Sequence, residues 1–99
     1  MQTFDLGDQP RFSVTFQVSG TDTDPTTVKF KYRTPANVET ELVHGTDVEV
    51  VKDATGQYHV DLLLNASGVW YVRWVGTGAA AAADEDTVRC AVTSFTDPL

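Results

Sequence analysis

The two histidines of this 99-residue sequence are the first side chains to consider for chemistry. His44 and His59 are fifteen positions apart, which matches no usual spacing of metal ligands. A zinc site needs three or four converging ligands, and no second motif supplies them. We therefore expect surface histidines, with His44 at a turn, His59 on the outer face of a strand, and no bound metal.

Acidic residues are numerous, but their pattern indicates neither catalysis nor calcium binding. Seven are expected in loops: Asp22, Asp24, Asp47, Asp53, Asp84, Glu85 and Asp86. None of these runs has the ligand periodicity of a calcium loop. Asp61 and Glu49 lie in no recognisable catalytic motif, and a domain of this size leaves little room for a deep cleft. We therefore interpret the loop acids as solvated turn residues.

Nucleophile and phosphate-binding motifs are also missing from the sequence. There is no Gly-x-Ser-x-Gly elbow, and Gly76-x-Gly78 lacks the third glycine and the lysine of a phosphate-binding loop. Cys90 is expected in the middle of a strand with apolar neighbours on its face, which indicates a buried, inert thiol. The sequence predicts no enzyme and no cofactor.

The aromatic segment around residue 70 offers the best candidates for molecular contacts. Trp70 and Trp74 share one face of a strand with Val72, which favours burial in the core. The opposite face and the acidic run that follows supply the candidate contact residues: Tyr71, Arg73, Val75, Asp84, Glu85 and Asp86. A sugar-binding platform is the alternative. It would expose an aromatic residue beside polar groups, from among Tyr32, Tyr58, Tyr71, Trp70 and Trp74.

Alternation of apolar and polar residues predicts the strands that must position these side chains. Seven are expected, at residues 11–19, 27–34, 38–43, 48–51, 57–64, 69–75 and 87–95. Bases at 29, 31 and 33 and acids at 39 and 41 predict a hairpin joined by opposite charges. The alanine-rich segment from Gly76 to Asp86 is expected to be a mobile loop.

These elements predict an all-β domain, a single two-sheet β-sandwich of about seven antiparallel strands. Residues 1–10 are expected to form an N-terminal arm or a first edge strand, residues 11–95 the sandwich, and residues 96–99 a C-terminal tail. The apolar fraction of 41% is sufficient for one core. With one cysteine, no intrachain disulfide can form, so packing must hold the domain together.

Charge and targeting signals narrow the possible partners. The formal charge is -7 and the bases are dispersed, so nucleic acid is a poor partner. The first residues lack a basic region and an apolar run, and no stretch approaches membrane-spanning length. We expect synthesis in a cytoplasm without a signal peptide, and no membrane partner.

The turn Ser67-Gly68-Val69-Trp70-Tyr71 resembles the corner before the sixth strand of immunoglobulin-like domains. In those domains a small residue and a glycine precede an aromatic residue that points inward. The usual cysteine pair is absent, so the resemblance implies a fibronectin-like or bacterial immunoglobulin-like sandwich rather than an antibody-type domain.

Three segments resemble short accessory structural proteins of tailed bacteriophages with an immunoglobulin-like domain. They begin at Asp24-Pro25-Thr26, at Gly56-Gln57-Tyr58 and at Gly68-Val69-Trp70-Tyr71-Val72-Arg73-Trp74, the last followed by Gly76-Thr77-Gly78. The resemblance implies a virion component, either a capsid decoration or a part of the head-to-tail connection or tail. It also implies docking on other virion proteins and a homo-oligomeric ring or array. A carbohydrate or host-surface binding module remains the alternative.

Overall fold

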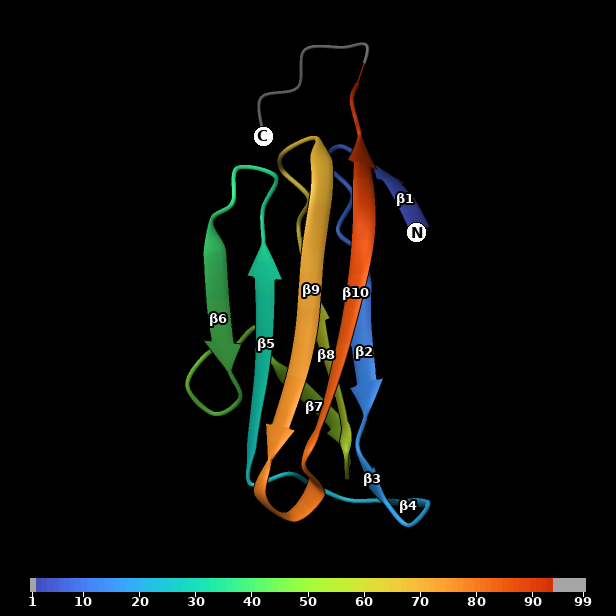
Figure 1. The fold of residues 1–99 in the computed structure, drawn as a ribbon, viewed down its shortest axis with the longest axis vertical. Helices are drawn as coiled ribbons and strands as arrows, with labels where there is room; N and C mark the ends of the chain where they lie inside the picture. The colour runs from blue at the N-terminus through green and yellow to red at the C-terminus, as the bar shows by residue number, and fades with distance from the viewer. Residues whose placement is uncertain (1, 94–99) are drawn as a thin grey trace.

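A computed structural model describes residues 2–93 and shows two facing β-sheets (Figure 1). The larger sheet has the strand order β1 (Gln2–Asp5), β10 (Ala82–Ala91), β9 (Gly68–Thr77), β5 (Thr27–Arg33), β6 (Glu39–Val43). The smaller sheet has the order β2 (Arg11–Thr15), β8 (Gln57–Asp61), β7 (Val51–Ala54). A short hairpin joins β3 (Gln17–Val18) to β4 (Thr21–Asp22), and η1 (Gly78–Ala80) is a single 3-10 turn.

This arrangement is an immunoglobulin-like sandwich. In such domains strands B, E and D form one sheet, and strands G, F and C form the other, which variable-type domains extend by C′. Here β2, β8 and β7 follow the first order, while β10, β9, β5 and β6 follow the second. The predicted all-β class is confirmed, and the seven expected strands correspond to β2 and β5–β10. β1 adds an edge strand that runs parallel to β10.

The core lies between the two sheets, as the alternation of residues requires. The larger sheet contributes Trp70, Val72 and Trp74 from β9 and Val28 and Phe30 from β5, all buried. The smaller sheet and its connections contribute Tyr58, Val60, Leu62 and Leu64. Trp70 and Trp74 are 1% and 3% exposed, so the prediction that both belong to the core is confirmed.

The predicted loop from Gly76 to Asp86 is wrong. β9 continues to Thr77, η1 makes the turn, and β10 already begins at Ala82. β10 then pairs with β9 without a register shift from Ala82 to Cys90. A run of alanines has no alternation to indicate a strand, but the neighbouring β9 supplies the backbone partners that extend β10 through it. Asp84, Glu85 and Asp86 therefore lie in a strand and not in a loop.

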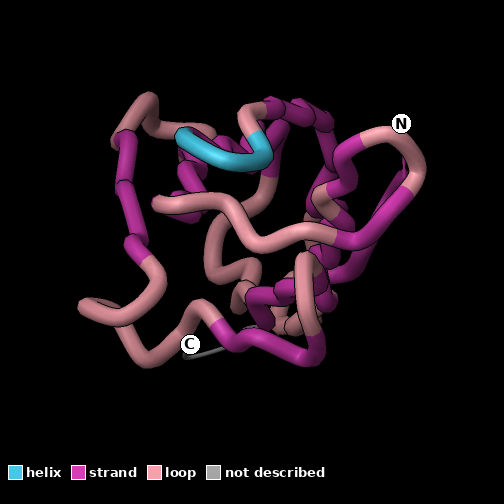
Figure 2. Tube along the Cα trace, turned by 90° about the horizontal axis from the view of Figure 1, so that it is seen from below, coloured by secondary structure: helices cyan, strands magenta, loops and turns pink. Residues whose placement is uncertain are grey.

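Smaller differences concern strand ends. The strand expected from residue 11 to 19 is divided, because β2 pairs with β8 as far as Thr15, whereas Gln17–Val18 form β3 and pair with β4. The strand expected at 48–51 lies at Val51–Ala54. The last strand ends at Ala91. Its expected end, Phe95, lies outside the described residues. Figure 2 shows the molecule along its long axis, with the strands and loops around the interior and η1 as a short helical turn. Nowhere in residues 2–93 is a helix long and apolar enough to cross a membrane.

Candidate docking surface

The outward side of the larger sheet carries three of the predicted contact residues. On β9, Tyr71, Arg73 and Val75 alternate with the buried tryptophans, so they point away from the core. Tyr71 is 45% exposed, Arg73 is exposed and Val75 is half-buried. We call the outward side of β5, β6, β9 and β10 the outer face.

Neighbouring strands place charged side chains beside Tyr71. The pairing of β5 with β9 sets Arg33 opposite Tyr71 and Lys31 opposite Arg73. The guanidinium carbon of Arg33 lies 6.0 Å from the centre of the Tyr71 ring, at the limit of a cation–π contact. On the other side, β10 sets Glu85 opposite Arg73, and their side chains form an ion pair of 3.3 Å. Tyr71 is therefore an exposed ring with charged side chains around it.

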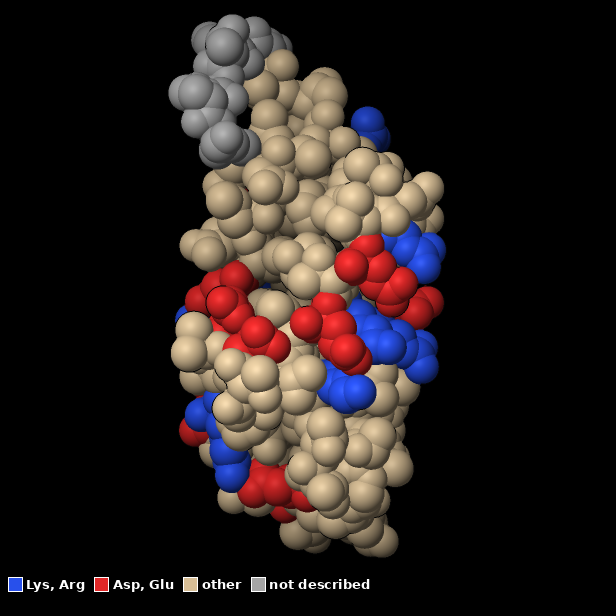
Figure 3. Space-filling view, turned by 90° about the vertical axis from the view of Figure 1, so that its left-hand side faces the viewer, with Lys and Arg blue, Asp and Glu red and all other residues tan. Residues whose placement is uncertain are grey.

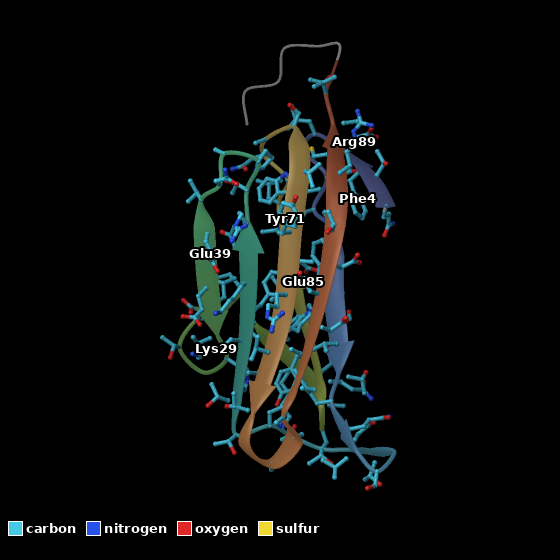
Figure 4. All side chains as sticks on the ribbon, viewed as in Figure 1. Phe4, Lys29, Glu39, Tyr71, Glu85 and Arg89 are labelled. Carbon is cyan, nitrogen blue, oxygen red and sulfur yellow. The ribbon has the colours of Figure 1, made fainter. Side chains whose placement is uncertain are left out.

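These side chains line a shallow pocket of about 230 Å³. Its lining comes from β5 (Lys31, Tyr32, Arg33), β6 (Glu39), β9 (Tyr71, Val72, Arg73) and β10 (Glu85). Figure 4 shows Lys29, Glu39, Tyr71 and Glu85 on this side of the sheet, from four adjacent strands. Figure 3, seen from the β6 side, shows acidic and basic side chains interleaved across the middle of the molecule.

The acidic run is divided between the two sides of β10. Glu85 belongs to the outer face with Arg73, whereas Asp84 and Asp86 are opposite Trp74 and Val72 in the register and point to the other side. All three are exposed. The structure therefore brings Tyr71, Arg73 and Glu85 together, leaves Val75 two residues further along β9, and separates Asp84 and Asp86 from the group.

Three charged residues of the pocket were not among the predicted contact residues. Lys31, Arg33 and Glu39 were assigned only to the hairpin charges, and that assignment is confirmed, with Lys29–Glu41 at 3.3 Å and Arg33–Glu39 at 3.9 Å. The same period of two that indicates the ion pairs also places these residues on one side of β5 and β6. What the sequence lacked was the position of β5 next to β9, which makes the charged hairpin part of the surface around Tyr71.

The prediction that His59 lies on the outer surface is wrong. His59 is 7% exposed, and its Nδ1 lies 2.7 Å from Asp53 Oδ2, a residue of β7 that was expected in a turn. β8 is the central strand of the smaller sheet, so its neighbours cover side chains that an edge strand would expose. Within residues 2–93, no group of three or more His, Cys, Asp and Glu side chains is arranged to hold a metal ion.

A second polar cluster lies at the end of the molecule near β4, and its groups form hydrogen bonds with one another within the fold. Asp24 accepts hydrogen bonds from Lys52 Nζ at 2.7 Å, Gly56 N at 2.7 Å and Tyr58 Oη at 3.1 Å. The ammonium of Lys52, followed by the Gly56 amide, holds the pKa of Asp24 below its usual value. Burial, followed by the Asp24 carboxylate, raises the pKa of Tyr58 to about 12. This Asp24 cluster ties the approach to β5 to the β7–β8 hairpin.

Cys90 lies in the core near the far end of β10. It is 1% exposed, as expected from its apolar neighbours in the sequence. Burial raises the pKa of its thiol, so the protonated form is favoured. The side chain therefore lacks both the exposure and the thiolate character that a nucleophile requires.

Comparison with known proteins gives a structural similarity only. No protein-family model and no curated protein matches the sequence. Among solved structures, the chain is similar to the solution structure of the Ig-like domain of human Leucine-rich repeat-containing protein 4, with 12% sequence identity and a TM-score of 0.38. The match covers 97% of this chain and 86% of that chain. The assignment as an immunoglobulin-like sandwich rests on the strand order and the two facing sheets.

Proposed function

We propose that this chain is a non-enzymatic docking module of a tailed-phage virion that binds another virion protein through its outer face. The observation that carries the docking role is the exposed ring of Tyr71 at the centre of four adjacent strands. Tyrosine and arginine are the residue types that most often dominate binding energy when a partner covers them. A rigid sheet holds them in place before binding, which lowers the entropic cost of association.

The charge of the outer face supports a protein partner. Five of the seven lysine and arginine side chains project from this face, according to the register of its strands: Lys29, Lys31, Arg33, Arg73 and Arg89. They are interleaved with Glu39, Glu41 and Glu85, although the whole chain carries a formal charge of -7. Mixed charges around an exposed aromatic residue suit a protein surface of matching pattern, since such pairs set orientation and exclude wrong partners.

The virion location is supported by the resemblance of three segments to phage accessory proteins. Those segments begin at Asp24, Gly56 and Gly68, and the third contains Tyr71 and Arg73. In the assembly, a ring or array of copies would present the same face repeatedly, so a modest affinity per copy would be sufficient for stable attachment.

A carbohydrate or host-surface binding module is the second candidate, and Tyr71 is the observation that favours it. An exposed aromatic ring beside polar groups is the platform that such a module needs. However, Arg33 lies over the Tyr71 ring, and both tryptophans, the other large rings of β9, are buried. These contacts favour the protein partner.

The virion role is tested by mass spectrometry of purified particles of the phage that encodes the chain. We expect the protein in stoichiometric amounts, and its absence from intact particles would refute the proposal. The docking surface is tested by adding purified protein to particles that lack it. Tyr71→Ser should weaken binding more than tenfold, the equivalent of about 1.4 kcal/mol or more.

The matched control is Val48→Ser, which removes an apolar side chain that is 88% exposed and lies away from the outer face. We expect wild-type binding from this variant and wild-type unfolding curves from both. Equal binding by the Tyr71 and Val48 variants would exclude the outer face. A glycan array distinguishes the second candidate from the first. Only a sugar-binding module would bind glycans, and its glycan binding would be lost in Tyr71→Ser.

A further inference from the structure

β10 has an unpaired edge along half of its length. On one side it pairs with β9 from Ala82 to Cys90, but on the other side β1 pairs only with Val88–Ala91. Across residues 2–93, no strand pairs with residues 82–87 on the side away from β9 (Figure 1). We call residues 82–87 the open edge. It is a different surface from the outer face, and binding at this edge does not depend on the proposed virion role.

The backbone of the open edge presents hydrogen-bonding groups to the outside. The N–H of Thr87 donates to Asp86 Oδ1 at 2.8 Å and is therefore not used in the ladder with β9. In an antiparallel pair, alternate residues direct both N–H and C=O to the partner strand, and the residues between direct them away. Ala83 and Glu85 share the direction of Thr87, so their N–H and C=O groups also point outward.

Charged side chains are the one usual obstacle to strand pairing that the open edge carries. Natural sheets guard their edges with charged residues, especially lysine, and with proline, bulges or covering loops. Residues 82–86 are exposed, contain no lysine or proline, and keep an unbroken register with β9. Ala82 and Ala83 present only methyl groups. Another strand can therefore approach this backbone closely.

The acidic residues decide which strand can approach. Glu85 is paired with Arg73, but no Lys, Arg or His of residues 2–93 lies within ion-pair distance of Asp84 or Asp86. A second copy that added the same edge would bring these carboxylates together, and like charges on adjacent strands destabilise the pairing. A segment with basic side chains would instead neutralise them.

We propose that the open edge binds an extended segment of another protein that carries Lys or Arg at alternate positions. The segment adds a strand to the larger sheet and bonds to the outward backbone groups of Ala83 and Glu85. Its basic side chains on one side then contact Asp84 and Asp86. Six residues of edge, at roughly 3.4 Å each, accommodate a segment about 20 Å long.

The probe for this site is a capped peptide of about eight residues in which lysine alternates with threonine. Nuclear magnetic resonance of the labelled protein should show shifts along β10 and slower amide exchange at Glu85. Ala83→Pro removes an outward N–H without removing a backbone bond to β9 and without changing the charge, because this N–H faces solvent, where proline is tolerated. We expect it to weaken peptide binding at least tenfold.

Charge is tested separately with a matched pair of variants. Asp84→Lys and Glu49→Lys change the net charge equally, but Glu49 lies in the β6–β7 connection, away from the open edge. We expect at least tenfold weaker binding for Asp84→Lys and less than twofold change for Glu49→Lys. A peptide N-methylated at alternate residues keeps its charge but loses backbone donors, and it should not bind.

Three results would overturn the proposal. The first is equal affinity for the wild-type and Ala83→Pro proteins, or for the plain and N-methylated peptides if the proline variant does not fold. The second is an equal effect of the Asp84 and Glu49 variants, which would indicate nonspecific attraction by net charge. The third is a set of peptide-induced shifts on β5 and β6 instead of β10.

Discussion

At the scale of single residues, Tyr58 connects the core to the Asp24 cluster. Its ring is buried and meets Phe16 edge-on, with centroids 6.0 Å apart, while its hydroxyl donates to Asp24. An unperturbed tyrosine titrates near pH 10. Because burial and the nearby carboxylate both oppose ionisation of Tyr58, the folded state favours the neutral phenol.

This shift makes stability depend on pH in the alkaline range. The pKa of Tyr58 is raised to about 12 in the folded protein, so the neutral-phenol contribution is complete below about pH 10 and is lost between about pH 10 and 12. Tyr58→Phe should lack this part of the alkaline loss in the free energy of unfolding. Urea unfolding at a series of alkaline pH values measures the difference. Parallel curves for the two proteins would contradict the expectation.

Gly56 is a second residue whose identity follows from its surroundings. Its φ is +72°, and a Cβ at this position would lie 2.6 Å from the Phe16 carbonyl oxygen and 2.8 Å from the Thr23 amide nitrogen. The same backbone groups make hydrogen bonds, since Phe16 N donates to Gly56 O and Thr23 N donates to Phe16 O. A side chain would therefore push apart the strands that meet here.

We expect Gly56→Ala to lower the free energy of unfolding by at least about 2 kcal/mol, because backbone strain and a clash with fixed atoms add. Gly20→Ala is the matched control. Gly20 has a φ of +80°, but its Cβ would meet nothing within 4 Å, so only the backbone strain of about 1 kcal/mol remains. Urea unfolding of the three proteins measures both effects, and equal losses would show that the close contacts are relieved.

At the scale of elements, the corner before β9 follows a known device of immunoglobulin-like domains. In many of them a tyrosine near the start of strand F hydrogen-bonds to the backbone a few residues upstream. Here Trp70 takes that place, and its indole Nε1 donates to the Ala66 carbonyl at 2.9 Å. The resemblance of the Ser67-Gly68 turn to this corner is visible in the sequence. The hydrogen bond gives the buried indole N–H of Trp70 a partner.

The two tryptophans offer a matched test of this corner. Trp70 and Trp74 are both buried, but the indole Nε1 of Trp74 has no hydrogen-bond partner among residues 2–93. Replacement by phenylalanine removes the same volume at both positions, and only at Trp70 does it remove a hydrogen bond. We expect Trp70→Phe to lower the free energy of unfolding by about 1 kcal/mol more than Trp74→Phe. Equal losses in urea unfolding would mean that the bond to Ala66 contributes nothing.

The β5–β6 hairpin shows what alternation alone can predict at this scale. Bases at every second position of β5 and acids at every second position of β6 indicated facing charges, and the register confirms Lys31 opposite Glu41 and Arg33 opposite Glu39. The ion pairs are largely exposed, so each contributes no more than about 1 kcal/mol and mainly helps to set the register.

At the scale of the whole molecule, the two sheets enclose both tryptophans and leave Tyr71 outside. We therefore expect acrylamide to quench the tryptophan fluorescence of the folded protein weakly and that of the protein in urea strongly. Strong quenching of both residues in the folded state would contradict the arrangement of the core. Single-tryptophan variants, Trp70→Phe and Trp74→Phe, assign the signal to each position.

The molecule also separates its charges by surface. Most of its bases project from the outer face, whereas Asp84 and Asp86 lie on the opposite side of β10, at the edge of the sheet. The two proposed binding sites therefore lie on surfaces of different chemistry. That arrangement suits a component that connects other proteins, as in the proposed virion role.

Alternating residues were sufficient to predict the approximate positions of most strands, the core side of β5 and β9, the burial of both tryptophans and the charged hairpin. Each of these depends on which side of its own strand a residue faces, and a period of two contains that information. For the same reason it was predictable that Tyr71 and Arg73 point to the side of β9 away from Trp70 and Trp74.

Apart from the β5–β6 hairpin, only the tertiary structure decided which strands lie side by side. The alanine-rich segment has no alternation, and it became part of β10 because β9 offers its backbone partners. The same pairing placed Glu85 beside Arg73, put Asp84 and Asp86 on the other side, and left the open edge where β1 is too short to reach. Strand neighbours are set by contacts between residues distant in the sequence, which no local pattern records.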